Sequence, residues 1–187
     1  TLMHMLERYT AYMTKNRGTL LPKIVAMLEL NVKNFQAKTY VIVTVNTLRT
    51  KVSRIYQLKG VMLHRFTKRV DATSELALKD KNFIEDNVSS LDFGSQSSSF
   101  LRQLHDDTEF LKTCSHVGYT LNIAYSRTHG EHCWTLADGL YVYVYMGNTL
   151  RSYSMKKQME GKFKGLKHGG GHSASATPNS YRDRLLQ

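Results

Sequence analysis

A short basic turn carries the residues best suited to contact a phosphate. The segment Arg54-Ile55-Tyr56-Gln57-Leu58-Lys59-Gly60 is typical of a strand that ends in a turn, because glycine adopts backbone angles that other residues avoid. Lys59 is therefore a candidate phosphate ligand, although a lysine before a glycine is more often only solvated. Four further segments follow in a fixed order, and this order makes the turn informative: Leu78–Phe83, Gly118–Leu121, Met155–Lys157 and Tyr181–Leu185.

Histidine and cysteine residues are weaker candidates for chemistry. His129, His132 and Cys133 lie close together, and His116 precedes them, but a second paired motif of the kind that zinc sites use is missing. Cys114 lies two residues before His116, yet no third group orients this pair for nucleophilic catalysis. We therefore predict no metal site and no thiol nucleophile.

A lysine-rich segment near the C-terminus predicts a contact with anions. From Ser154 onward apolar residues return at helical spacing, and lysines cover the rest of the helix: Lys156, Lys157, Lys162, Lys164 and Lys167. Such a helix can lie on an anionic membrane when several lysines act together, since each contributes about 1 kcal/mol. A basic face packed on its own domain explains the pattern equally well. RNA binding is a weaker alternative, because an alternating strand accounts more simply for the nearby aromatic residues.

The overall charge also favours an anionic partner. The chain has 187 residues, with 26 Lys and Arg against 15 Asp and Glu, and its formal charge is +11. This length suits one domain.

Two cysteines form no disulfide framework, which favours a reducing, intracellular compartment. No run of about 18 apolar residues is present, so we expect a peripheral rather than a transmembrane protein. A start at Thr1 indicates a processed, trimmed or incompletely registered chain.

The first half of the chain predicts one helix followed by strands. Apolar residues recur at helical spacing from Leu2 to Met13, and the helix ends at Asn16-Arg17-Gly18. Strands are predicted over Ile24–Val32 and Thr39–Thr47. The second of these is almost continuously β-branched, as is typical of a strand covered on both faces. Val61–Val70 is expected to be another strand or an extended segment.

The second half predicts two helices and a pair of strands. A helix is expected over Ser97–Cys114, capped by Ser99, with Asp106, Asp107 and Glu109 facing solvent. The remaining expected elements are a polar loop over 86–99, strands over Gly118–Ser126 and Leu140–Met146, a turn at Gly147-Asn148, a basic segment over 154–180 that is extended over Ser173–Ser180, and a last helix over Tyr181–Gln187. Strands with helices packed to one side predict an α+β fold.

The ordered motifs resemble the phosphatidylinositol phosphate kinases, and most closely the type II branch of 5-phosphate 4-kinases. The matching segments are Thr19-Leu20-Leu21-Pro22, Thr44-Val45-Asn46, Tyr56–Gly60, Leu78–Phe83, Gly118–Asn122, Lys156-Lys157, Lys167–Gly171 and Tyr181–Leu185. The resemblance implies one kinase-like domain over 1–187, made of antiparallel strands with packed helices. It implies the hinge and the larger lobe of that fold, without the glycine-rich phosphate-loop lobe.

The chain departs from the family where the chemistry is done. The resemblance implies a catalytic aspartate at Gly118, a magnesium-binding aspartate at Asn148, and an aspartate of the basic turn at Gln57. Glycine cannot accept a proton, and neutral amides bind hard cations more weakly than carboxylates do. Thr44 and Asn46 match hinge positions that meet the nucleotide base in the family, although a plain strand end explains them more simply.

We therefore expect a catalytically inactive, kinase-like module that needs no cofactor. It would be a structural or regulatory subunit of a larger assembly, with protein subunits and anionic membrane or phosphoinositide as partners and nucleic acid as a less favoured one. The alternative is a divergent active lipid kinase that uses ATP and Mg²⁺ and receives its small lobe from elsewhere.

Overall fold

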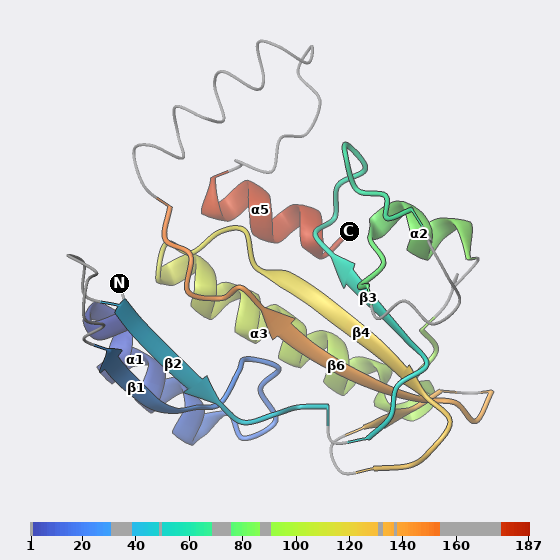
Figure 1. Cartoon of the computed structure of the whole chain (residues 1–187), viewed down its shortest axis with the longest axis horizontal. Coiled ribbons are helices and arrows are strands. Elements are labelled where there is room, and N and C mark those ends of the chain that lie inside the picture. Colours follow the sequence, from blue (N-terminus) through green and yellow to red (C-terminus); the bar gives the residue numbers. More distant parts are fainter. Residues whose placement is uncertain are drawn as a thin grey trace.

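The computed structural model describes residues 2–30, 39–48, 50–68, 76–86, 91–130, 133–136, 138–153 and 177–187. In chain order its elements are α1 (Leu2–Lys15), β1 (Ile24–Leu30), β2 (Thr39–Thr44), β3 (Arg54–Leu58), α2 (Asp80–Glu85), η1 (Gly94–Gln96), α3 (Ser97–Thr113), β4 (Thr120–Ser126), β5 (Trp134–Thr135), β6 (Tyr141–Gly147) and α5 (Pro178–Leu185). Mixed helices and antiparallel sheets confirm the predicted α+β fold (Figure 1).

The larger sheet has four antiparallel strands in the order β3-β4-β6-β5. Its central pair consists of the two predicted strands, β4 and β6, in a register that joins Thr120 to Gly147 and Ser126 to Tyr141. The short edge strand β5 lies between them in the chain, where no strand was predicted. Two residues give no detectable pattern of alternation, so this strand could not be found from the sequence.

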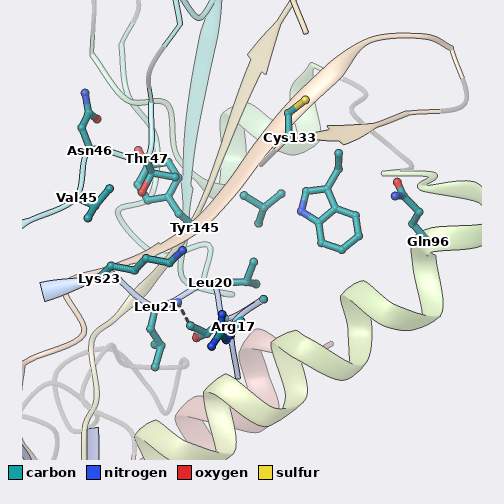
Figure 2. Close-up of a pocket in the computed structure, with 14 residues that line it drawn as sticks. Arg17, Leu20, Leu21, Lys23, Val45, Asn46, Thr47, Gln96, Cys133 and Tyr145 are labelled. Carbon is teal, nitrogen blue, oxygen red and sulfur yellow. Dashed lines mark hydrogen bonds between the residues drawn. The ribbon is translucent and has the colours of Figure 1, made fainter. Parts of the chain in front are cut away.

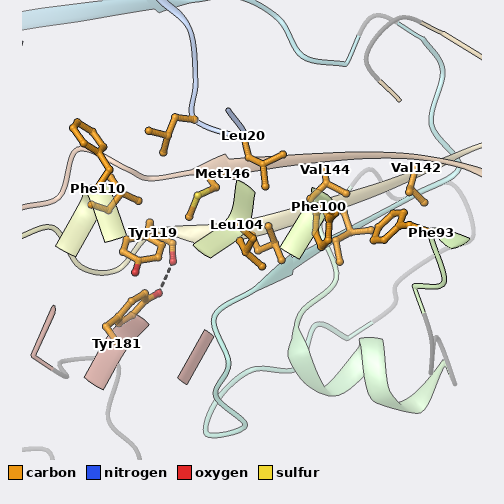
Figure 3. Packing of buried hydrophobic residues seen from close by; sticks show 14 of the residues in the cluster. Leu20, Phe93, Phe100, Leu104, Phe110, Tyr119, Val142, Val144, Met146 and Tyr181 are labelled. Atoms are coloured by element: carbon orange, nitrogen blue, oxygen red, sulfur yellow. Dashed lines mark hydrogen bonds between the residues drawn. The ribbon is translucent and has the colours of Figure 1, made fainter. Parts of the chain in front are cut away.

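The main core lies between this sheet and α3. Phe100, Leu104 and Leu111 of α3 are buried together with Val142 and Met146 of β6 (Figure 3). Alternate residues of a strand point to the same face, whereas apolar residues of a helix recur every three or four positions. Both patterns are present here, so the two elements bury their apolar faces against each other.

The predicted first helix is confirmed as α1, and the two predicted strands after it pair as β1 and β2. The expectation that β2 is covered on both faces is wrong. It pairs with β1 in a separate two-stranded sheet, and Tyr40, Val41 and Val43 are exposed. A run of β-branched residues indicates a strand but does not by itself report what covers the strand.

Several local predictions also need correction. Helix α3 begins at Ser97 as predicted, but its N-cap is Gln96, and the Ser99 hydroxyl donates to the Gln96 carbonyl. The predicted polar loop is interrupted by η1, and residues 61–68 form no strand. The six-residue helix α2 was not predicted, because it is too short for a periodic pattern.

The last helix is α5, and it begins earlier than predicted. Thr177 caps it by accepting a hydrogen bond from the Ser180 amide at 3.3 Å, and Pro178 occupies the first turn, where a missing amide hydrogen does no harm. Residues 178–180, which were expected to be extended, are therefore helical. Of the predicted basic segment over 154–180, residues 154–176 lie outside the described residues.

Candidate functional site

The three positions that lack the expected aspartates meet at one end of the larger sheet. Gln57 on β3 pairs with Asn122 on β4, which in turn pairs with Tyr145 on β6. Gly118 lies just before β4, and Asn148 directly follows β6. Antiparallel pairing therefore brings Gln57, Gly118 and Asn148 to the same sheet end, although 91 positions separate the first from the last.

The backbone at Gly118 favours glycine. Its φ is +79°, in the left-handed region that other residues rarely adopt. A Cβ atom at this position would lie 3.3 Å from Cδ of Arg151. Asn148 has a φ of 53°, which asparagine tolerates better than most residues because its side chain can hydrogen-bond locally. The residue types at both positions thus agree with the local backbone.

Neutral polar side chains fill the interior of this sheet end. Thr120 and Asn122 are buried, and the Asn122 amide donates to the Tyr145 carbonyl and to the Thr120 hydroxyl, both at 3.3 Å. A Cβ atom at Gly147 would lie 2.8 Å from the Asn122 amide nitrogen, so glycine makes room for this side chain. The cluster holds no carboxylate among the residues that the structure describes.

Asp80, a buried carboxylate near this end, organises the turn after β3. It accepts hydrogen bonds from the backbone amides of Lys59 at 2.8 Å and Val61 at 3.3 Å, and from Nε of Arg65 at 2.7 Å. The Arg65 guanidinium also donates to the Gln57 carbonyl. Asp80 lies within the Leu78–Phe83 motif, but neither Asp80 nor Arg65 was predicted as a site residue, because nothing in the sequence indicates that they pair.

The prediction that Asp107 faces solvent is wrong. Its carboxylate is fully buried and accepts four hydrogen bonds: from Thr19 Oγ1 at 2.6 Å, Tyr12 Oη at 2.7 Å, the Leu20 amide at 2.7 Å and Gln103 Nε2 at 3.0 Å. Burial raises the pKa of Asp107, while these donors oppose the shift. Its neighbours Asp106 and Glu109 keep exposed side chains, as predicted.

Helix α5 covers the same sheet end. The Tyr181 hydroxyl donates to the Tyr119 carbonyl, and the two rings lie 4.7 Å apart at 70° (Figure 3). The Arg184 guanidinium lies 4.8 Å from the centre of the Tyr181 ring. A Cβ atom at Gly60 would lie 2.5 Å from the Arg184 carbonyl oxygen, so only glycine lets the basic turn approach the helix this closely.

A pocket of about 420 Å³ lies beside β6 of the larger sheet, between this strand and the segments that flank β1 and β2. Asn46 and Lys23 line one side, and Gln96 lies opposite, just before α3 (Figure 2). Of the three residues predicted to bind nucleotide, the structure places only Asn46 at this pocket. Thr44 pairs with Ile24 in the small sheet, and Lys59 belongs to the basic turn.

A family model described as Phosphatidylinositol-4-phosphate 5-Kinase matches residues 1–137. The chain belongs to this family. It is 32% identical over 134 residues to human "Phosphatidylinositol 4-phosphate 5-kinase-like protein 1", covering 70% of this chain and 33% of that protein. It is 36% identical over 124 residues to rat "Phosphatidylinositol 5-phosphate 4-kinase type-2 alpha", covering 64% of this chain and 30% of that protein. The chain thus spans about a third of the length of these relatives.

Membership of the phosphatidylinositol phosphate kinase family confirms the resemblance drawn from the motifs. The predicted anion-binding lysines, Lys156, Lys157, Lys162, Lys164 and Lys167, lie outside the described residues, as does His132. Among the described residues, no group of three or more histidines, cysteines or carboxylates is placed to hold a metal ion. None of the described helices is both long and apolar enough to cross a bilayer.

The pKa values of Cys114 and His116 are both shifted in the direction that disfavours a reactive thiolate–imidazolium pair. Burial raises the pKa of the Cys114 thiol, which lowers the fraction of the nucleophilic thiolate. Burial lowers the pKa of His116, so its ring stays neutral near neutral pH.

Proposed function

We propose that this domain is a catalytically inactive member of the phosphatidylinositol phosphate kinase family, acting as a structural or regulatory subunit of a larger assembly. The observation that carries the proposal is Gly118. At the position of the expected catalytic carboxylate, the chain has no side chain, and its left-handed backbone disfavours one.

The buried carboxylates support the same conclusion. Phosphoryl transfer needs metal ions that neutralise the developing charge and a carboxylate near the attacking hydroxyl. Asp80 is engaged by two backbone amides and Arg65, and Asp107 by four donors. A carboxylate that already accepts this many hydrogen bonds is poorly placed to bind Mg²⁺ or to take a proton. Neither residue replaces the aspartates that the chain lacks.

The role as a subunit is supported by the exposed face of the small sheet. Leu28 and Val41, which pair across β1 and β2, are 48% and 37% exposed, and Leu30 and Val43 flank them on the same face at 42% and 39%. A contiguous aliphatic surface of this kind is typical of a protein contact. The net charge of +11 supports a second, anionic partner, for which a membrane containing phosphoinositide is the natural candidate.

A lipid kinase assay tests the proposal. The purified chain is incubated with ATP, Mg²⁺ and vesicles that contain phosphatidylinositol 4-phosphate or phosphatidylinositol 5-phosphate, and bisphosphate product is measured. We expect no product above the blank without protein. Product formation that requires the chain would instead support the alternative, a divergent active kinase that uses ATP and Mg²⁺.

A further inference from the structure

The turn after β3 presents its side chains in an unusual arrangement. Within residues 61–68, the apolar side chains of Met62, Leu63 and Phe66 are exposed by 46%, 44% and 47%. Arg65, which lies among them, is turned inward, and only 12% of its side chain is exposed. On the surface of a soluble protein, arginine side chains are usually exposed and large apolar side chains are usually buried. The turn reverses this pattern, and a group of exposed apolar side chains is typical of a binding surface.

The base of the turn is firmly held. Arg65 connects the turn to β3 and to α2. Its guanidinium contacts the Asp80 carboxylate at 2.7 Å and donates to the Gln57 carbonyl. Its own carbonyl accepts a hydrogen bond from the Lys81 amide at 3.0 Å. His64 at the tip has a φ of 56°, which reverses the chain direction. The exposed apolar groups are thus held in place in advance, so that little conformational entropy is lost when they bind.

The lysines make the turn positive. Residues 57–68 contain Lys59, Arg65 and Lys68 and no acidic residue, and because Arg65 is paired with the buried Asp80, the positive charge of the turn comes from Lys59 and Lys68. Lys81 lies beside the turn through the hydrogen bond of its amide, and both Lys68 and Lys81 are exposed. An apolar tip surrounded by lysines is complementary to an anionic bilayer, whose interface accepts apolar side chains and whose headgroups attract the lysines.

We propose that Met62, Leu63 and Phe66 insert into the interface of an anionic lipid bilayer and anchor the domain there. This inference rests on the membrane role within the proposed function and names the residues that would carry it. Figure 1 shows the chain looping out after β3, between α5 and α2. Insertion would turn the sheet end that holds Gly118 and Asn148 toward the membrane.

Vesicle binding tests the inference. The full chain is mixed with phosphatidylcholine vesicles with and without phosphatidylserine, and sedimentation is measured for the wild type and for the Met62→Ser/Leu63→Ser/Phe66→Ser variant. The matched control is Leu6→Ser/Leu101→Ser/Leu140→Ser, which removes three exposed apolar side chains from other parts of the domain. We expect the turn variant to bind anionic vesicles about tenfold more weakly, because it loses the apolar transfer energy, and the control to bind like the wild type.

A depth measurement separates insertion from simple adsorption. The chain has a single tryptophan, Trp134, which provides the baseline fluorescence. In the Phe66→Trp variant we expect additional emission that brominated lipids quench. Equal binding of the turn variant and the wild type, absence of this quenching, or a wild type that binds no anionic vesicles would each overturn the inference. Lipid phosphorylation by the wild type would overturn the proposed inactivity and would leave the insertion result unaffected.

Discussion

The hydroxyl of Thr19 donates a hydrogen bond of 2.6 Å to the carboxylate of Asp107, which lies 88 positions further along the chain. The same carboxylate accepts hydrogen bonds from the hydroxyl of Tyr12 on α1 and from the backbone amide of Leu20. The Leu20 carbonyl in turn accepts from the Met146 amide of β6 at 2.7 Å. One buried carboxylate on α3 therefore connects the first helix, the segment that follows it and strand β6 of the larger sheet.

Removal of the Asp107 carboxylate should destabilise the domain strongly. Asp107→Ala leaves several donors without a partner, and we expect the free energy of unfolding to fall by about 3 kcal/mol. Urea denaturation measures this change. Asp106→Ala is the matched control on the same helix, where an exposed side chain should change stability by less than about 0.5 kcal/mol. Similar values for the two variants would contradict the structural role of Asp107.

His116 should make stability depend on pH. Burial lowers its folded pKa below the usual value of 6.5, so the folded state binds fewer protons than the unfolded state below that pH. The free energy of unfolding should therefore fall as the pH drops from 6.5 through the lowered pKa. The difference between the wild type and His116→Gln, measured by denaturation at several pH values, isolates this contribution. A difference that stays constant with pH would contradict the prediction.

Regular amphipathic patterns predicted most of the fold. The helix predicted over Ser97–Cys114 matches α3 to within one residue, and the strands predicted over Gly118–Ser126 and Leu140–Met146 match β4 and β6 to within two residues. Failures occurred where the deciding contact lies far away in the chain. Asp107 looks like a solvent-facing residue in the sequence because its partners come from positions 12–20 and from Gln103.

The positions of the candidate site were predicted from the sequence, but the contacts that support them were not. The family resemblance implied the positions Gln57, Gly118 and Asn148, and the strand register places them at one end of the larger sheet. Nothing in the sequence indicates that Gly60 packs against the carbonyl of Arg184, since this approach depends on how α5 docks. Backbone contacts of this kind leave only a glycine as their trace.

Restoring the three aspartates should not create a lipid kinase. In the variant Gln57→Asp/Gly118→Asp/Asn148→Asp, the Cβ atom at position 118 would lie 3.3 Å from Cδ of Arg151. We expect the new carboxylate to pair with the Arg151 guanidinium. We expect no lipid product in the kinase assay. The Gly118→Ala control separates backbone strain, which should cost about 1 kcal/mol in unfolding free energy, from any effect of the carboxylate. Measurable phosphorylation by the triple variant would refute the prediction.

The basic segment should contribute to anion binding through charge. We expect Lys156→Glu/Lys157→Glu/Lys162→Glu/Lys164→Glu to weaken binding to phosphatidylserine vesicles, and wild-type binding to weaken as salt is added, because salt screens exposed charges. A matched variant reverses four exposed cations elsewhere: Lys15, Arg17, Lys51 and Arg102. Equal losses in the two variants would mean that only net charge matters, and no loss would place these lysines on a face that does not bind.

Nucleotide binding should not depend on magnesium. Asn148 and Gln57 offer neutral amides where a hard cation prefers carboxylates, and Gly118 offers no ligand. In a thermal unfolding experiment with ATP and with GTP, we therefore expect the same melting temperature with and without Mg²⁺. Asn46→Ala serves as a second probe, because Asn46 lines the pocket beside β6 and a Mg²⁺-independent shift that disappears in this variant would locate the nucleotide there. A stabilisation that requires Mg²⁺ would reveal a surviving metal site and would favour the active-kinase alternative.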